Sequence, residues 1–260
     1  MTTALSINLN KIALIRNSRD TEYPSVVEHA AKCIEFGADG ITVHPRPDQR
    51  HIRADDCYAL ADFLKQQHPT IEFNIEGNPF APAMVSSRKN VSDYPGFMEI
   101  IRTIKPAQCT LVPDSNEQLT SDHGFDLRKD TSQLKAIIEE CQSLGCRVSL
   151  FMDPDKEQLR LAKDIGADRI EFYTGPYADA HLKGDASNAL ALFTAAGDYA
   201  AEIGLEVNAG HDLNLHNLKT FVSNVPNVLE VSIGHAFTVD AIELGLKEAV
   251  KRYQVELGNL

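Results

Sequence analysis

Histidine and glutamate residues stand at or near the C-terminal ends of several short apolar runs in this sequence. They are His44, Glu76, Glu171, His211 and His235. Such side chains donate and accept protons, and histidine ordinarily titrates close to neutral pH. A structural core would not gather them at equivalent places in separate runs. Their repetition therefore predicts one shared acid–base site.

A cluster of basic residues follows His44. Arg46, Arg50, His51 and Arg53 lie within a short stretch of a chain whose formal net charge is −12. The overall charge argues against nucleic acid as the main partner, because phosphate backbones attract basic surfaces. A local cluster still suits a small anion, since arginine binds phosphate well. We expect a phosphate-binding site here rather than a solvated face.

The same residues leave a metal site open as an alternative. His44, Glu76 and His211 would make a ligand set of two histidines and one carboxylate, which is common for metals. No local spacing such as H-E-x-x-H supports a metal, and general acid–base catalysis needs the same residue types. The sequence favours acid–base chemistry.

Eight short apolar runs are predicted to be the strands that position these residues. Each is rich in Val, Ile, Leu or Phe and is bounded by polar residues, Gly or Pro, which is typical of strands in a parallel sheet. The predicted strands are Leu5–Asn10, Gly40–Arg46, Ile71–Gly77, Gln108–Asp114, Arg147–Asp153, Arg169–Gly175, Leu205–His211 and Val228–His235.

Helix-period sequence lies between most of these strands, and glycine marks where a helix ends and a strand begins. Gly37, Gly145, Gly166 and Gly204 occupy this position, where glycine accepts a left-handed conformation. Four similar joints indicate repeated βα units. The predicted helices are Ser25–Phe36, Thr131–Leu144, Glu157–Ile165 and Ala186–Ile203.

Eight βα units in 260 residues predict an α/β fold, a (β/α)8 TIM barrel, as a single domain over residues 1–260 with long βα loops or extra short helices. No G-x-G-x-x-G loop follows a strand, which weakens an open nucleotide-binding sheet. The long loops are Asn78–Gly96 and Asp114–Lys129.

Since barrel enzymes act at the C-terminal strand ends, the histidines and glutamates should meet at one mouth. Asp39 and Asp168 belong to the opposite face, where we expect a stabilising role.

The cysteines and the apolar content are those of a cytoplasmic protein without membrane segments. The five cysteines form no C-x-x-C pair and are odd in number, so we expect reduced thiols. The first residues show no signal peptide, and no apolar run approaches the length of a membrane span. We therefore expect a cytoplasmic enzyme with no nucleic-acid or membrane partner.

Two segments of the sequence are long and specific, Gly37–Ile52 and Val207–His211. Shorter distinctive segments are Ile7–Ala13 with Leu14–Arg19, Phe73–Glu76, Thr110–Pro113 and Ser232–Ala236. With these segments, the sequence from about Leu5 to Lys251 resembles the pyridoxine 5'-phosphate synthase family of vitamin B6 biosynthesis.

The resemblance implies a ring-closing condensation of 3-amino-2-oxopropyl phosphate with 1-deoxy-D-xylulose 5-phosphate, without a metal or organic cofactor, in a homo-octamer. By matching motifs, His44 and Glu76 would accept protons, His211 would donate one, and Glu171 would stabilise charged intermediates. The positions that would hold the amino-ketone phosphate are Asn8, Arg19, Asp212, Gly234 and His235. Those that would hold the deoxyxylulose phosphate are Asn10, Lys11, Arg46, His51 and Thr120.

The chain departs from the common family pattern at three places. Asn10-Lys11 stands where many members have Asp-His, and Asp212 stands where Gly is common. A carboxylate at 212 would repel a phosphate unless it points away. The Asn78–Gly96 loop is also longer than usual. None of these differences removes a proposed acid or base.

Two other functions remain open at this stage. One is a metal-dependent aldolase or hydrolase that uses His44, Glu76 and His211. The other is a non-catalytic barrel that binds a phosphorylated sugar, although such a protein would not need acid–base residues at its mouth.

Overall fold

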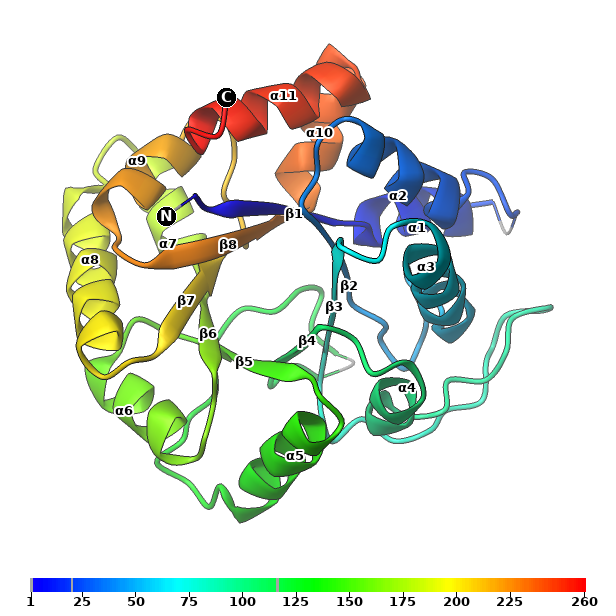
Figure 1. Ribbon diagram of the computed structural model, residues 1–260, viewed down its shortest axis with the longest axis horizontal. Helices are drawn as coiled ribbons and strands as arrows, with labels where there is room; N and C mark the ends of the chain where they lie inside the picture. Colours follow the sequence, from blue (N-terminus) through cyan, green and yellow to red (C-terminus); the bar gives the residue numbers. More distant parts are fainter. Residues whose placement is uncertain (1, 20, 116) are drawn as a thin grey trace.

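The computed structural model of the chain describes residues 2–19, 21–115 and 117–260, and these form a closed parallel barrel (Figure 1). The strands follow one another around the barrel in sequence order, and β8 closes it by pairing with β1. The predicted (β/α)8 fold is confirmed. The strands are β1 (Ala4–Asn8), β2 (Gly40–Val43), β3 (Glu72–Gly77), β4 (Gln108–Leu111), β5 (Arg147–Met152), β6 (Arg169–Phe172), β7 (Glu206–Ala209) and β8 (Val228–Ile233).

Helices surround the barrel on its outer side (Figure 1). They cover the apolar outer faces of the strands, so the main core lies between the two layers. The helices are α1 (Asn10–Asn17), α2 (Val26–Glu35), α3 (Ala54–Gln67), α4 (Phe97–Ile104), α5 (Ser132–Ser143), α6 (Lys156–Asp164), α7 (Gly175–Leu182), α8 (Ser187–Glu202), α9 (Leu218–Asn224), α10 (His235–Leu244) and α11 (Leu246–Glu256).

Except for β3, which ends at Gly77 as predicted, the strands end earlier than predicted, because their last predicted residues belong to the segments that follow them. Asn10 and Lys11 open helix α1 instead of ending β1, and His44 comes one residue after β2. His235, predicted to end the last strand, begins helix α10. Asn10, Lys11 and His44 therefore lie just beyond the strands at the mouth of the barrel, whereas Glu76 and Glu171 lie within β3 and β6.

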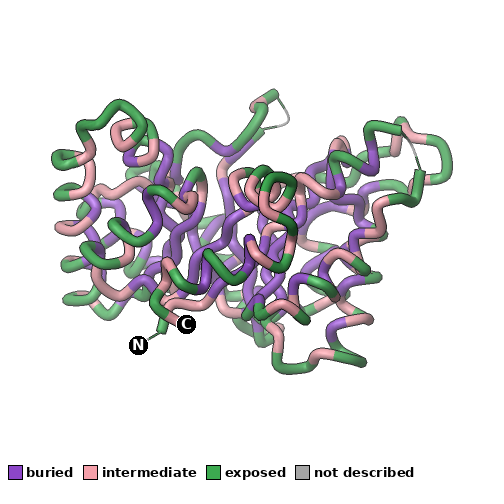
Figure 2. The backbone as a smooth tube through the Cα atoms, turned by 90° about the horizontal axis from the view of Figure 1, so that it is seen from above, coloured by how far each residue is buried: buried purple, intermediate pink, exposed green. Residues whose placement is uncertain are grey.

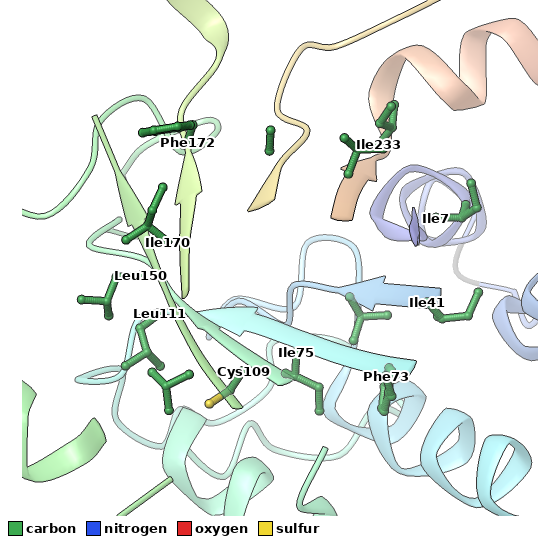
Figure 3. Packing of buried hydrophobic residues seen from close by; sticks show 14 of the residues in the cluster. Ile7, Ile41, Phe73, Ile75, Cys109, Leu111, Leu150, Ile170, Phe172 and Ile233 are labelled. Atoms are coloured by element: carbon green, nitrogen blue, oxygen red, sulfur yellow. The ribbon is translucent and has the colours of Figure 1, made fainter. Parts of the chain in front are cut away.

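Apolar and polar residues alternate along the strands between the outer and inner faces. Ile41, Ile75 and Leu150 are among the outward residues that pack toward the helices (Figure 3). The inner face is polar: Gln108 on β4 donates a hydrogen bond of 3.4 Å across the barrel to Glu230 on β8. Buried residues lie on the strands and on the helix sides that face them, and exposed residues are concentrated on the outer sides of the helices and on the loops (Figure 2). Period-two alternation thus directs polar side chains into the barrel.

Two aspartates hold the helix–strand joints at the face opposite the mouth. Asp39 accepts a hydrogen bond from the backbone N–H of Leu5, and Asp168 accepts one from that of Val148, at 2.9 and 2.8 Å. The glycine two residues before each aspartate has a positive φ, +109° at Gly37 and +95° at Gly166. These contacts match the stabilising role expected for both aspartates.

The long 78–96 loop forms an arm outside the barrel wall (Figure 1). Met84 and Tyr94 pair across it as an isolated antiparallel bridge. The buried Tyr94 donates a hydrogen bond of 3.4 Å to the carbonyl of Pro45, and Gln49 donates one of 2.8 Å to that of Ser92. The base of the arm therefore braces the basic segment after β2.

Membrane-spanning helices are not found among the described residues, since none is both long and apolar enough.

Replacing Gly210 with alanine should destabilise the barrel more than the same change at a helix–strand joint. A Cβ at Gly210 would lie 2.0 Å from the carbonyl oxygen of Ser232, which belongs to the β8 backbone and cannot move aside. At Gly145, with φ +88°, a Cβ would meet nothing within 4 Å. We expect Gly210→Ala to lower the free energy of unfolding by about 3 kcal/mol and Gly145→Ala by about 1 kcal/mol. Urea unfolding of both variants measures this, and equal losses would contradict it.

Candidate active site

A cavity of about 390 Å³ opens at the C-terminal mouth of the barrel. Its wall comes from the ends of the strands and from the segments that follow them. Every site residue that the family resemblance implies lines this cavity except Arg19, and Arg53 of the basic cluster also lies outside its wall. The lining set contains Asn8, Asn10, Lys11, His44, Arg46, His51, Glu76, Thr120, Glu171, His211, Asp212, Gly234 and His235.

Arg19 stands apart from this group. It is exposed and follows helix α1 outside the cavity wall. Several lining residues were not identified from the sequence, among them Phe151, Thr110 and Ser232. They point inward by strand alternation, so a strand-by-strand assignment of inward positions would have found them.

His44 lies between two carboxylates. Its Nδ1 is 3.8 Å from Oε2 of Glu76, and its Nε2 is 3.6 Å from Oδ2 of Asp114. All three side chains are buried. The backbone N–H of His44 donates to the side chain of Asn10 at 2.9 Å, which ties the start of α1 to the end of β2. Either carboxylate can therefore exchange a proton with the imidazole after a small movement.

Burial keeps both His44 and Glu76 uncharged near neutral pH. Burial first, then the positive charge of Arg46, lowers the pKa of His44 to about 3. Burial first, then the negative charges of Glu230 and Asp114, raises the pKa of Glu76 to about 8. An uncharged imidazole can accept a proton, whereas Glu76 must first release one.

Glu171 projects into the cavity from β6. Burial, followed by repulsion from Glu76 and Glu230, holds its pKa well above the usual range. Its Oε2 atom is buried and has no hydrogen-bond partner among the residues that the structure describes. Since buried polar atoms are normally paired, this atom is available to a group bound in the cavity.

His211 is held through both ring nitrogens. Its Nδ1 lies 2.8 Å from Oδ2 of Asp212, and its Nε2 lies 2.9 Å from Oγ1 of Thr120, in the loop after β4. The ring also packs edge-on against Tyr173, with ring centroids 5.3 Å apart. The Asp212 carboxylate is therefore directed to the imidazole of His211.

The basic segment after β2 forms one part of the cavity wall. Arg46 pairs with Asp114 and donates hydrogen bonds of 3.1 and 3.2 Å to the carbonyls of Ser115 and Gln118. His51 accepts a hydrogen bond of 2.9 Å at Nδ1 from the N–H of Ile52. Burial holds the pKa of His51 well below its usual value. Its neutral ring therefore carries the proton on Nε2, which can donate to a phosphate oxygen.

The start of helix α10 forms another part of the cavity wall. The helix begins at His235, directly after Gly234, and its first residues line the cavity. The N–H groups of a first helical turn have no partner within the helix and attract anions. A Cβ at Gly234 would lie 3.1 Å from the side chain of Asn8, so glycine permits the close approach of β8 to β1.

A metal centre has no support in this geometry. Within residues 2–19, 21–115 and 117–260, no three His, Cys, Asp or Glu side chains are grouped so that they could hold a metal ion. His44, Glu76 and His211 share the cavity without forming such a group.

A closed (β/α)8 barrel with acid–base groups inside its mouth and cationic or N–H donors at two ends defines an enzyme for phosphorylated small molecules. The model of the pyridoxal phosphate biosynthesis protein PdxJ matches residues 5–259, so the chain belongs to this family of pyridoxine 5'-phosphate synthases.

Two pyridoxine 5'-phosphate synthases from Xanthomonas species are identical to this chain at just over half of the aligned positions. The chain is 55% identical to the pyridoxine 5'-phosphate synthase of Xanthomonas axonopodis pv. citri (strain 306), over 97% of this chain and 96% of that protein. It is 54% identical to that of Xanthomonas campestris pv. campestris (strain B100), over 97% and 95% of the two chains. The predicted enzyme class is thereby confirmed.

Solved structures of other barrels share the fold. The 3-keto-L-gulonate-6-phosphate decarboxylase of Vibrio cholerae superposes with a TM-score of 0.61 at 12% identity, covering 99% of this chain and 98% of that one. At that identity, only the fold is shared.

Glu76→Gln should become more stable relative to the wild type as the pH rises. The folded-state pKa near 8 lies above the ordinary value of 4.5, so the folded state keeps a proton that the unfolded chain releases between these values. The contribution of Glu76 to the free energy of unfolding is fully present below about pH 4.5 and is lost as the pH rises to about 8. Glutamine does not titrate, so the variant loses no stability at this position over the same range. We expect Glu76→Gln to gain about 2–4 kcal/mol over wild type between pH 4.5 and pH 8, at roughly 1.4 kcal/mol per pKa unit. Parallel stability curves in urea unfolding would contradict the shifted pKa.

Proposed function

We propose that the cavity joins 3-amino-2-oxopropyl phosphate to 1-deoxy-D-xylulose 5-phosphate and forms pyridoxine 5'-phosphate, phosphate and water. The observation that carries this proposal is the single cavity that contains His44, Glu76, Glu171 and His211 between two anion-binding ends. Two phosphorylated substrates need two such ends, and ring closure needs several proton transfers between them.

The two ends suit different substrates. The deoxyxylulose phosphate would lie against the basic segment, whose proposed contacts are Asn10, Lys11, Arg46, His51 and Thr120. The amino-ketone phosphate would lie near the start of α10, with Asn8, Gly234, His235 and the backbone of Asp212 as contacts. Arg19 is exposed outside this cavity, so its contact would require movement of the segment after α1 or a second copy of the chain.

The acid–base roles follow from protonation and position. His44, uncharged and buried, accepts a proton directly. Glu76 accepts one once it is ionised, and its neighbour Asn8 donates a hydrogen bond of 3.2 Å to the oxygen that faces His44. His211 donates a proton through Nε2, the nitrogen not bound to Asp212. Once it is ionised, Glu171 stabilises the developing cation of an imine or its adduct, to which its unpaired Oε2 is available.

The functions left open by the sequence fit less well. A metal-dependent aldolase or hydrolase needs a ligand group that the described residues do not form. A barrel that only binds a sugar phosphate would not need the unpaired buried carboxyl oxygen of Glu171.

We also propose a single-domain, cytoplasmic protein that assembles as a homo-octamer. Five free, buried cysteines agree with a reducing compartment. Exposed Leu14 and Ile15 on α1, together with Val239 and Ile242 on α10, offer apolar surface for contacts between copies. Light scattering of the purified protein measures the subunit number.

Incubating the protein with both phosphorylated substrates should yield pyridoxine 5'-phosphate, detected by mass spectrometry. Glu76→Gln and His211→Asn should each lower turnover by about 10²-fold or more, because each removes a general acid or base. The exposed Glu99 and His216 provide matched controls, and Glu99→Gln and His216→Asn should keep wild-type turnover. Near-normal turnover in a site variant would exclude that residue from the mechanism.

Lys11 should make sugar-phosphate binding less sensitive to pH than a histidine would. Lysine ordinarily stays charged far above pH 8, whereas histidine ordinarily loses its charge near pH 6.5. Lys11 lines the cavity at the proposed deoxyxylulose phosphate end. We expect the affinity for deoxyxylulose phosphate to fall less between pH 6 and pH 8 in the wild type than in Lys11→His. Calorimetric titration of both proteins measures this, and parallel pH profiles would show that residue 11 makes no charge contact.

A further inference from the structure

We propose that Asp212 is a positioning residue, which orients His211 and favours its protonated form, rather than a side-chain ligand of the substrate. This inference rests on the proposed role of His211 as the proton donor. It assigns a function to a side chain that stands where glycine is common.

The hydrogen bond between the two residues determines which nitrogen faces the cavity. Oδ2 of Asp212 lies 2.8 Å from Nδ1 of His211, so a carboxylate there requires the proton on Nδ1. Nε2 is then directed to Oγ1 of Thr120, at 2.9 Å, and to the cavity. The catalytic proton must therefore leave from Nε2.

The backbone holds Asp212 in the conformation that this contact needs. Its φ is +67°, in the left-handed region that favours glycine. The buried Asn217 donates a hydrogen bond of 3.3 Å to the carbonyl of Asp212, and Thr174 donates one to the carbonyl of His211. Tyr177 in turn donates to the carbonyl of Asn217 at 2.9 Å. Residues that do not line the cavity thus support an unfavourable backbone geometry, which often marks a functional site.

The surroundings keep the Asp212 carboxylate ionised. The hydrogen bond to His211 is the main cause that lowers the pKa of Asp212, and the nearby charges of His235 on α10 and Lys11 on α1 act in the same direction. The other groups facing His211 are Tyr173 after β6 and His44 after β2. An ionised carboxylate at hydrogen-bond distance favours the imidazolium, the form that donates a proton.

The same charge makes Asp212 a poor phosphate ligand. A carboxylate directed to the amino-ketone phosphate would repel it, whereas one bonded to His211 is partly neutralised. Loss of the carboxylate should therefore act on turnover and on pH dependence, with little effect on substrate binding.

The variant Asp212→Asn tests this, because asparagine has the same size, tolerates a positive φ and lacks the charge. We expect kcat to fall about 10-fold, with KM for 3-amino-2-oxopropyl phosphate changed less than about 2-fold. A proton donor acts while protonated, so the alkaline limb of the pH–kcat profile should move to lower pH by about 0.5–1 unit. An unchanged kcat and an unmoved limb would overturn the proposal, as would a raised KM without a change in kcat.

The pair Asp122 and His123 supplies the matched control. These exposed residues are joined at 2.6 Å outside the cavity wall, and Asp122→Asn should leave the pH–kcat limb in place. In a His211→Asn background, Asp212→Asn should cause no further loss of turnover. A further loss would show that Asp212 acts independently of His211.

A nuclear magnetic resonance titration of the His211 ring, without substrate, separates this inference from the proposed function. Its midpoint should be lower in Asp212→Asn than in wild type, and an unchanged midpoint would overturn the pairing. Retained turnover in His211→Asn would instead overturn the proposed proton donor, whatever the titration shows.

Discussion

The enclosure of several carboxyl groups within one closed barrel is the constraint on which the site depends. Glu76, Glu171 and Glu230 point inward from three strands, and water reaches none of them freely. They cannot all carry a charge in so small a space, because each ionised neighbour makes the next ionisation harder. Burial raises the pKa of Glu76 to about 8 and that of Glu230 to about 7. The barrel therefore retains protons at neutral pH, which a reaction built from proton transfers can use.

The hydrogen-bond donors expected to hold phosphate, of which Arg46 is cationic and His51 neutral, stand above these carboxyls along the barrel. Arg46 and His51 stand on the segment above β2, and the first turn of α10 stands above β8. If the inner carboxyls were ionised, they would repel a phosphate bound at the rim. Because the inner carboxyls are neutral, the donors at the rim dominate the electrostatic potential that a bound anion experiences. Arg46 itself is fixed by Asp114 and by loop carbonyls, so its guanidinium is ordered before any ligand arrives.

The sequence predicts the barrel well because its signals are local. Short apolar runs, helical periodicity and glycine at Gly37, Gly145, Gly166 and Gly204 depend on neighbouring residues, and all four glycines have a positive φ. Strand ends are harder to predict, because Asn10 and Lys11 read equally well as the end of a strand or as the start of helix α1.

Long-range partners leave no local signal. The contact of Thr120 with His211 joins residues that are 91 positions apart, and the Arg46–Asp114 pair spans 68. Family resemblance supplies candidate residues for the site, but the direction of the Asp212 carboxylate follows from a backbone angle that no motif records. The position of Arg19 outside the cavity is likewise a matter of how the chain runs after α1.

The two aspartate joints opposite the mouth are held by the same set of contacts. Asp39 accepts from Leu5 and from the amide of Gln254, and Asp168 accepts from Val148 and from the amide of Gln142. Each glutamine also donates to the glycine carbonyl of its joint. These contacts are four strands apart, so they relate β1–β4 to β5–β8. The residues at the mouth do not repeat between the two halves, since β1–β4 provide His44 and β5–β8 provide His211. Repeated contacts therefore hold the closed end of the barrel, while the mouth carries different side chains on its two halves.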